Sequence, residues 1–417
     1  MRWKGIDTEI GTTFALDRIA ESCGIKEVLI DTMPLIWRDL LSCAFYIVSK
    51  GNAMTGYDAW RDSVDIPFGS SVCERDLHGL FKMASQSNAM DLFKRWRGHM
   101  KEPRLVLFEM QSAYNDIIDV EGGGAEGRRR FRTPPSTGCN VICGRNDGIP
   151  TYVTLNEGVE RFADGIAYSI ANTLILGFES MHCSLGHGRM KRDNVHRLDV
   201  NGVKFIMPFT RFSSNCAKLI SLKPNMLKSD QYRYNRHHWA PIGVWSTFPN
   251  DVGRIHLMGN QTLYDMYSDP SSDCQDGFLD DVALDVSMLN DLLIAGRIKA
   301  FFTNDPSLLT SDILKIEMNR SNIEKGFDGM LNMVDLHRFH LNSPHAIQGR
   351  GLISFISSVL RSYGAHASKG MDFDLAMSIV SEIRRVTYPD GSTGVTMLRP
   401  RHIEALKALN LPIGELF

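Results

Sequence analysis

The sequence lacks the short motifs of several common enzyme and metal-binding classes. No HExxH, GxSxG or phosphate-loop pattern occurs, and the eight cysteines are scattered without a CxxC pair. This cysteine spacing argues against a zinc ribbon, and we expect reduced thiols. The histidines left for an unrelated metal-dependent hydrolase are isolated ones, namely His182, His187 and the adjacent pair His237 and His238.

Long apolar runs and an excess of one charge are absent as well. The N-terminus lacks the apolar stretch of a signal peptide, and no uninterrupted apolar segment approaches the roughly 20 residues that span a bilayer. We therefore expect a cytoplasmic protein. The 46 basic and 48 acidic residues give a net charge of −2, which argues against a protein that coats nucleic acid non-specifically but allows a local basic groove.

The chain has 417 residues, of which 43% are hydrophobic, and this is enough for two or three domains or one elaborated domain. Helical patterns from Thr13 to about Trp96 predict a small all-α unit whose first helix ends at Gly24. A continuous apolar run, Leu105–Phe108, then predicts a buried strand that ends at Glu109.

A β-hairpin is predicted next. Asn140–Cys143 and Thr151–Thr154 flank the pair Asp147–Gly148, which suits a turn with positive φ. Residues 159–176 have a helical pattern and Val203–Met207 have a strand pattern. Strands and helices therefore alternate in an α/β core.

The pattern changes to polar and aromatic segments after residue 208, which predicts an insertion before the chain returns to the core with strand Ile298–Phe302. The predicted organisation has five parts: an N-terminal helical domain for DNA binding or dimerisation (1–100), the first part of the core (101–208), a β-rich inserted subdomain (209–300), the second part of the core with a glutamate-bearing helix (301–365) and a C-terminal helical tail (366–417).

The helix predicted after the insertion carries Glu317, Arg320 and Glu324 at spacings of three and four residues, so these side chains share one face. Apolar residues supply an opposite or flanking buried stripe: Ile313, Leu314, Ile316, Ile323, Phe327 and Met330. An arginine and a glutamate at this spacing are also the ordinary pattern of a solvated surface pair. Both interpretations stay open from the helix alone.

The position of this helix in the chain indicates more specific chemistry. Glu109 stands at the end of the first core strand, a second group follows a later strand, and Glu324 lies on a helix beyond an insertion. Such an arrangement holds two divalent cations for phosphodiester chemistry, because hard cations prefer oxygen ligands.

These segments resemble the DDE transposases of bacterial and archaeal insertion sequences, in the branch with the helix signature Tyr-x2-Arg-x3-Glu-x6-Lys. The similarity covers most of the chain: Gly11–Ala20 resembles the family's N-terminal helical region, Gly148–Tyr152 its core hairpin and Asp193–Val195 the segment after its second aspartate. The resemblance implies an α/β (α+β) fold with an RNase H-like core, an N-terminal helical domain and a β-rich insertion before the glutamate helix.

By this resemblance the catalytic residues are Glu109, His187 and Glu324, and Glu109 and Glu324 bind Mg²⁺ or Mn²⁺. The chain departs from the family at both aspartates, because Glu109 replaces the first and His187 the second. Imidazole is a poor Mg²⁺ ligand, and the longer side chain of Glu109 displaces its carboxylate, so we expect impaired catalysis. The signature tyrosine and lysine are Glu317 and Leu331 here.

The resemblance also implies that the partner is DNA, both the element ends and the target, bound by a homodimer. Basic side chains near the core predict contacts with DNA phosphates. The predicted DNA-binding residues are Arg128, Arg129, Arg130, Arg132, Lys191, Arg192, Arg233, Arg236 and Arg320. For the first four of these, a solvated loop between glycines and prolines is the alternative interpretation.

Three functions follow from the sequence. The first is a transposase-like protein that binds DNA and has impaired metal-dependent cleavage and strand transfer. The second is a catalytically inactive, domesticated transposase that acts as a DNA-binding or assembly protein. The third is an unrelated metal-dependent hydrolase.

Overall fold

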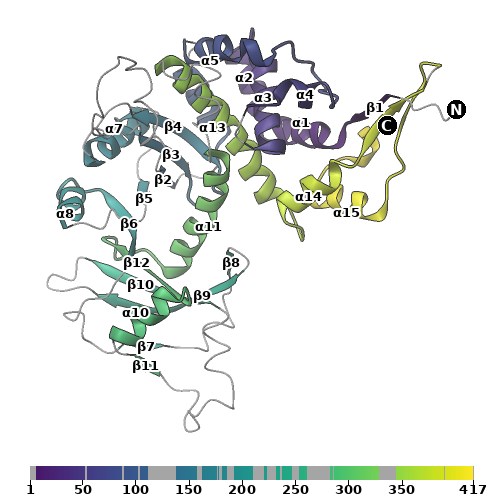
Figure 1. Cartoon of the computed structure of the whole chain (residues 1–417). Helices are drawn as coiled ribbons and strands as arrows, with labels where there is room; N and C mark the ends of the chain where they lie inside the picture. Colours follow the sequence, from purple (N-terminus) through teal and green to yellow (C-terminus); the bar gives the residue numbers. More distant parts are fainter. Residues whose placement is uncertain are drawn as a thin grey trace, which may run out of the picture.

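The computed structural model describes residues 6–51, 54–86, 89–101, 104–110, 138–156, 162–175, 177, 181–185, 192–209, 220–222, 232–234, 237–246, 253–260, 282–284, 286–327, 344–388 and 390–416. It has a mixed α/β architecture, in which N-terminal helices precede a mixed sheet and further helices follow it (Figure 1). Within these ranges, no helix has both the length and the apolar character needed to cross a membrane.

The predicted N-terminal helical region is confirmed. Its helices are α1 (Gly11–Cys23), α2 (Ile25–Thr32), α3 (Trp37–Lys50), α4 (Tyr57–Arg61), the short 3₁₀ helix η1 (Glu74–Asp76), α5 (Leu77–Gln86) and α6 (Ala89–His99). Helix α1 ends at Gly24, whose φ of 84° lies in the left-handed region that favours glycine.

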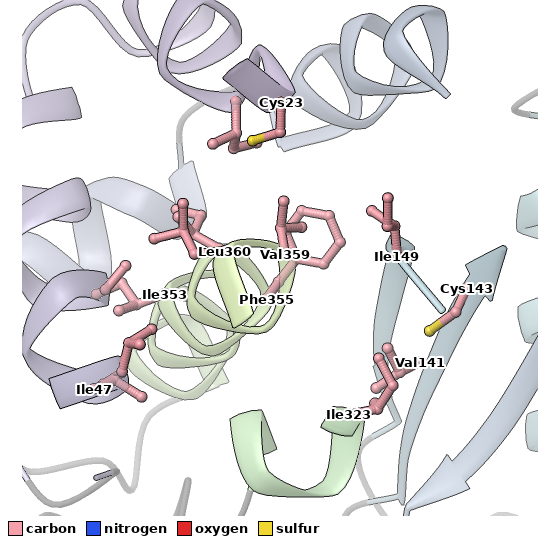
Figure 2. Packing of buried hydrophobic residues seen from close by; sticks show 14 of the residues in the cluster. Cys23, Ile47, Val141, Cys143, Ile149, Ile323, Ile353, Phe355, Val359 and Leu360 are labelled. Carbon is pink, nitrogen blue, oxygen red and sulfur yellow. The ribbon is translucent and has the colours of Figure 1, made fainter. Parts of the chain in front are cut away.

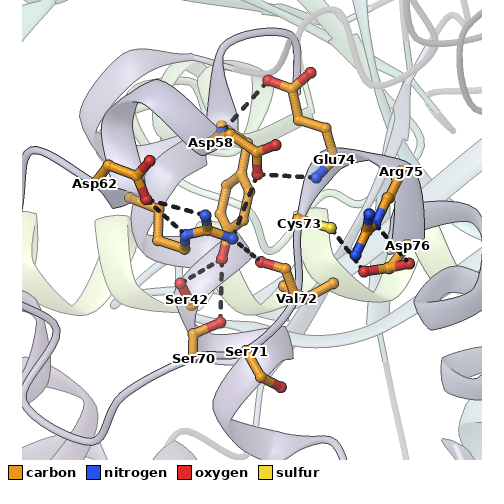
Figure 3. A network of polar contacts seen from close by, with 12 residues as sticks. Ser42, Asp58, Asp62, Ser70, Ser71, Val72, Cys73, Glu74, Arg75 and Asp76 are labelled. Atoms are coloured by element: carbon orange, nitrogen blue, oxygen red, sulfur yellow. Dashed lines mark hydrogen bonds and ion pairs between the residues drawn. The ribbon is translucent and has the colours of Figure 1, made fainter.

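Polar contacts fix the segment between α4 and α5 (Figure 3). The Glu74 carboxylate accepts a hydrogen bond from the backbone N–H of Gly56 at 2.7 Å, and the backbone N–H of Glu74 donates to Asp58 at 3.0 Å. The hydroxyl groups of Tyr57 and Ser42 lie 2.6 Å apart. Because buried polar groups are costly without partners, these bonds hold the segment in one conformation.

The central sheet has the strand order β4-β3-β2-β5-β6-β12-β10-β9-β8. Its strands are β2 (Leu105–Met110), β3 (Gly138–Gly144), β4 (Pro150–Asn156), β5 (Met181–Ser184), β6 (Lys204–Phe209), β8 (Tyr232–Tyr234), β9 (His237–Ser246), β10 (Arg254–Asn260) and β12 (Ile298–Thr303). Strand β5 is parallel to both β2 and β6, whereas every other neighbouring pair in this sheet is antiparallel.

The predicted hairpin is confirmed as β3 and β4. Gly148 in its turn has a φ of 64°, as the Asp–Gly pair predicted. A Cβ atom at position 148 would also lie 2.6 Å from the side chain of Asn319, so the turn needs glycine for space as well as for conformation. The turn is thereby fitted against the helix that contains Asn319.

Helices cover both faces of the first strands. Helices α7 (Phe162–Ile175) and α8 (Arg192–Val200) follow β4 and β5 in the chain, and Asn140 of β3 donates to Ser169 of α7 at 2.9 Å. On the other face, Val141 of β3 lies beside Ile323 of α11 (Thr310–Phe327) (Figure 2). Neighbouring residues of β3 thus face different helices, as the pleat of a strand requires.

The predicted insertion contains a two-stranded sheet, β7 (Ile220–Leu222) with β11 (Val282–Leu284), and the helix α10 (Val286–Ile294). Strands β8, β9 and β10 also belong to this part of the chain, and they extend the central sheet beyond β12. The boundaries of the predicted domains stay a prediction.

The long helix α13 (Pro344–Ala367) forms the centre of the core, between the N-terminal helices and the sheet (Figures 1 and 2). Its residue Ile353 faces Ile47 of α3 (Figure 2), and the ring of Phe355 lies 5.1 Å from the ring of Phe93 in α6. This helix therefore joins the all-α unit to the sheet in one core.

The two ends of the described chain meet in a small separate sheet. Strand β1 (Ile6–Glu9) pairs with β13 (Arg384–Thr387), which in turn pairs with β14 (Thr393–Val395). The remaining helices of the tail are α14 (Phe373–Val380), α15 (Pro400–Ala408) and the 3₁₀ helix η6 (Ile413–Leu416).

Candidate functional site

Helix α11 is the glutamate-bearing helix that the sequence predicted, and its first turns are bound to two parts of the sheet. Asp312 forms an ion pair with Arg145 in the β3–β4 turn, with 2.7 Å between Oδ2 and Nη2. Asn319 donates to the backbone carbonyl of Arg145 at 3.2 Å.

The first residue of α11, Thr310, contacts a different part of the sheet. Its hydroxyl lies 2.8 Å from Nδ1 of the buried His256 in β10. Burial lowers the pKa of His256 to about 4, so this ring is neutral at physiological pH.

Helix α11 also contacts the end of β5, through a polar cluster of Ser184, Glu317 and Arg320. The Ser184 hydroxyl donates to Oε1 of Glu317 at 3.3 Å, and Nη1 of Arg320 donates to Ser184 Oγ at 3.0 Å. The same guanidinium donates to the carbonyl of Leu185 at 3.3 Å. Glu317 is only 8% exposed. A carboxylate buried to this extent requires such partners, because its desolvation costs several kcal/mol.

The cluster lies beside the first core strand. Ser184 is the last residue of β5, and it is the register partner of Phe108 in the parallel strand β2. Arg320 therefore lies over the carboxyl ends of β2 and β5, the edge where the sequence predicted the site.

His182, two residues before Ser184 on β5, forms a second polar pair with Asp305. Nε2 of His182 is 2.7 Å from Oδ2 of Asp305, which follows β12, and both side chains are largely buried. Burial raises the pKa of Asp305, but hydrogen bonds from Ser307 and His182 outweigh burial and lower it to about 2. Burial also lowers the pKa of His182, against the opposing effect of Asp305. The pair is a neutral imidazole that donates to a carboxylate.

From this pair we predict that acid destabilises the fold. A carboxyl group whose pKa is lower in the folded chain stabilises the folded state at pH values above its ordinary pKa. For Asp305 this stabilisation is lost as the pH falls from about 4 to about 2. The lowered pKa of His182 also makes acid destabilising. The imidazole binds a proton more tightly in the unfolded chain than in the folded one, so the folded state loses stability as the pH falls below the ordinary pKa of histidine.

We expect Asp305→Asn to lower the free energy of unfolding by roughly 2 kcal/mol at neutral pH, with a smaller difference from wild type in acid. Urea unfolding at neutral pH and at about pH 3 measures both values. Asp291→Asn, at an exposed position of α10, is the matched control and should leave stability unchanged. A constant difference between wild type and Asp305→Asn at all pH values would contradict the argument.

The predicted catalytic residues are only partly described. Glu109 lies in β2, where its register partner is Asn140, and Glu324 lies in α11. The side chains of both glutamates, and the whole of His187, lie outside the described part of the structure. Their catalytic and metal-binding roles therefore stay predictions.

The described polar groups at the end of β5 do not by themselves fit a divalent metal ion. They are the Glu317 carboxylate, the Ser184 hydroxyl, the Leu185 carbonyl and the cationic guanidinium of Arg320, and a fixed cation disfavours a second one nearby. Within the described ranges, no three His, Cys, Asp or Glu side chains are grouped so that they could hold a metal. The predicted Mg²⁺ or Mn²⁺ site depends on Glu109 and Glu324.

Most of the predicted DNA-binding residues also lie outside the described part: Arg128, Arg129, Arg130, Arg132, Lys191 and Arg236. Arg192 begins α8 and Arg233 lies in β8, but their side chains are not described either. Arg320 is described, and its bonds to Ser184 and Leu185 fix the end of β5.

Sequence reasoning missed Ser184, Asp305 and the pairing of Arg145 with Asp312. Nothing in their local patterns indicates contact, since each pair is brought together by the packing of distant segments. Glu317 was noted as a departure from the family signature, yet its burial against Ser184 was not expected. Neither a scan of protein-family models nor a search of curated proteins finds a match to this chain.

Proposed function

We propose that this chain is a transposase-like protein with an RNase H-like core, that it binds DNA, and that its metal-dependent DNA cleavage is impaired. The observation that carries the proposal is the topology of the first five core strands. Strands β2, β3 and β4 form an antiparallel meander, and β5 and β6 continue from the other side of β2 in parallel. An RNase H-like core would have this strand order and these strand directions, so the topology supports the proposal.

The position of α11 gives further support. The helix follows the inserted segment and returns to the ends of β2 and β5, as the glutamate helix of that family does. Arg320, which matches the signature arginine, contacts both Ser184 and the Leu185 carbonyl there. Glu324 is four residues further along this helix and so follows Arg320 by about one turn.

The impairment is argued from the residues at the catalytic positions. His187 replaces an aspartate, and an imidazole suits Mn²⁺ better than Mg²⁺. Glu317 stands where the signature has tyrosine, and its carboxylate is committed to a hydrogen bond within the protein. A catalytic centre needs its groups within a fraction of an ångström of the productive geometry, so these changes reduce the rate of cleavage.

Cleavage of plasmid and duplex DNA in the presence of Mg²⁺ or Mn²⁺ tests this function. We expect weak cleavage by wild type, more with Mn²⁺ than with Mg²⁺, and a loss of roughly 100-fold in Glu324→Ala if that residue is a ligand. Glu404→Ala, at an exposed position of α15, is the control and should behave as wild type. Equal product from wild type and Glu324→Ala would show that Glu324 is not catalytic.

The same experiment separates the second candidate, an inactive DNA-binding protein. The observation in its favour is that Arg320 supplies a fixed positive charge at the end of β5. Salt-dependent DNA binding by wild type without any cleavage would support this candidate. Absence of both binding and cleavage at low salt would overturn the proposed function.

A further inference from the structure

The β-hairpin near the end of the chain carries an open sheet edge. Strands β13 and β14 form this hairpin, and its yellow ribbon in Figure 1 extends beyond the neighbouring helices α14 and α15. Strand β14 is the last strand in the order β1-β13-β14, and within the described ranges no further strand pairs with it. An edge of this kind presents unpaired backbone N–H and C=O groups to other chains.

The hydrogen bonds of the hairpin show which groups face outward. Two bonded pairs mark its ends: the N–H of Tyr388 donates to the Ser392 carbonyl, and the N–H of Thr396 donates to the Arg384 carbonyl, both at 2.8 Å. Bonded and non-bonded pairs alternate along an antiparallel ladder, so Val386 and Gly394, midway between these ends, are bonded as well. The backbone groups of Thr393 and Val395 therefore point away from β13, toward the open edge.

The side chains beside this edge suit pairing with an identical strand. Thr393 and Val395 are β-branched, which favours extended backbone, and none of the residues 391–398 is charged. A two-fold axis brings identical residues near one another, so a charged edge would repel its own copy, and this edge does not. Tyr388 and Met397 add apolar surface, since they are 51% and 87% exposed.

One register satisfies the outward groups of two copies. If β14 pairs antiparallel with β14 of a second copy about a two-fold axis at Gly394, Thr393 lies opposite Val395 of the second copy. Each such pair then exchanges both of its N–H···O bonds. A Cβ atom on Gly394 would lie 3.5 Å from Cε2 of Tyr388, so this ring covers the glycine, and the two tyrosine rings of the pair would lie near the axis on one face.

We propose that the open edge of β14 is a dimer interface and that its partner is a second copy of this chain. The proposal rests on the proposed function in one respect, because the resemblance implies a homodimer. It places the contact on the C-terminal hairpin, whereas the sequence predicted DNA binding or dimerisation for residues 1–100. Duplex DNA fits this edge less well, since residues 386–398 contain no basic side chain to contact a phosphate.

Sedimentation velocity of the full chain without DNA, over a range of concentrations, measures the dimer. Thr393→Pro removes the outward N–H and leaves the bonds to β13 in place, and Thr393→Val is the matched control that keeps this N–H. We expect Thr393→Pro to raise the dissociation constant of the dimer by roughly 10- to 100-fold, because the two-fold axis doubles the loss of one bond. Thr393→Val should dimerise as wild type does, and thermal unfolding verifies that both variants are folded.

Cross-linking tests the register. The two copies of residue 394 form a non-bonded pair with about 4.5 Å between Cα atoms, within the range of a disulfide. Gly394→Cys should therefore give a covalent dimer on a non-reducing gel after oxidation with diamide. Ser392→Cys, on the same face of the hairpin, is the control, because its two copies are offset by roughly 13 Å along the strands. Wild type gives the background from the native cysteines.

The outcomes separate this interface from the proposed function. A wild type that is monomeric at every concentration would overturn the interface and leave DNA cleavage to its own assay. An equally tight dimer of folded Thr393→Pro, or cross-linking of Ser392→Cys at the level of Gly394→Cys, would also overturn it. If wild type is monomeric and Thr393→Pro weakens duplex binding, the hairpin contacts DNA instead. A dimer that neither binds nor cleaves DNA would overturn the proposed function alone.

Discussion

Gly349→Ala is expected to destabilise the protein by roughly 3 kcal/mol or to prevent folding, because a side chain at this position meets the backbone of another helix. A Cβ atom on residue 349 would lie 1.8 Å from the carbonyl oxygen of Phe81 and 2.5 Å from its carbonyl carbon. Helices α13 and α5 are thus in direct backbone contact at this point. Because the atoms that would clash belong to the backbone of Phe81, no change of side-chain rotamer can relieve the clash. Relief requires the two helices to move apart, which opens the core around α13.

The matched control lies in the partner helix. A Cβ atom on Gly79 of α5 would meet nothing within 4 Å, so Gly79→Ala should be neutral or stabilise by about 0.5–1 kcal/mol through better helix propensity. Urea unfolding followed by circular dichroism measures both variants. A Gly349→Ala variant as stable as Gly79→Ala would show that α13 and α5 are not in the close contact described.

Elements with strong local signals were predictable from the sequence. The helix stop at Gly24 and the turn at Gly148 depend on conformations that only a few residues adopt readily, and these positions were identified correctly. The pairing of β1 with β13 was not predicted, and neither was the extension of the central sheet by β8–β10. Such pairings join segments distant in sequence, and local periodicity carries no information about them.

The candidate site shows the same division. Helical spacing correctly placed Glu317 and Arg320 on one helix, α11. Their shared contact with Ser184 depends on where α11 docks, which the helix sequence alone does not specify. The burial of Glu317 was missed because an acidic residue in a helix is usually exposed, and only its tertiary partners make burial tolerable.

Asp312→Ala is expected to lower the free energy of unfolding by about 2–3 kcal/mol, because it leaves the partly buried guanidinium of Arg145 without its counterion. The side chains of Arg145 and Asp312 are 11% and 21% exposed, so water screens the pair poorly. Asp312 also accepts a hydrogen bond from the backbone N–H of Leu309 at 3.3 Å, and this bond is lost as well. Lys315→Ala, at an exposed position of the same helix, should change stability by less than about 0.5 kcal/mol.

A double variant separates the effect of charge from that of packing. Arg145→Met with Asp312→Leu replaces the pair by apolar groups of similar volume, and replacements of this kind are often neutral or stabilising. We therefore expect the double variant to recover most of the stability that Asp312→Ala loses, as measured by urea unfolding. If the double variant is as unstable as the single one, the uncompensated charge is not the cause. Because Asn319 donates to the Arg145 carbonyl, recovery would also show that α11 keeps its place on the β3–β4 turn without the ion pair.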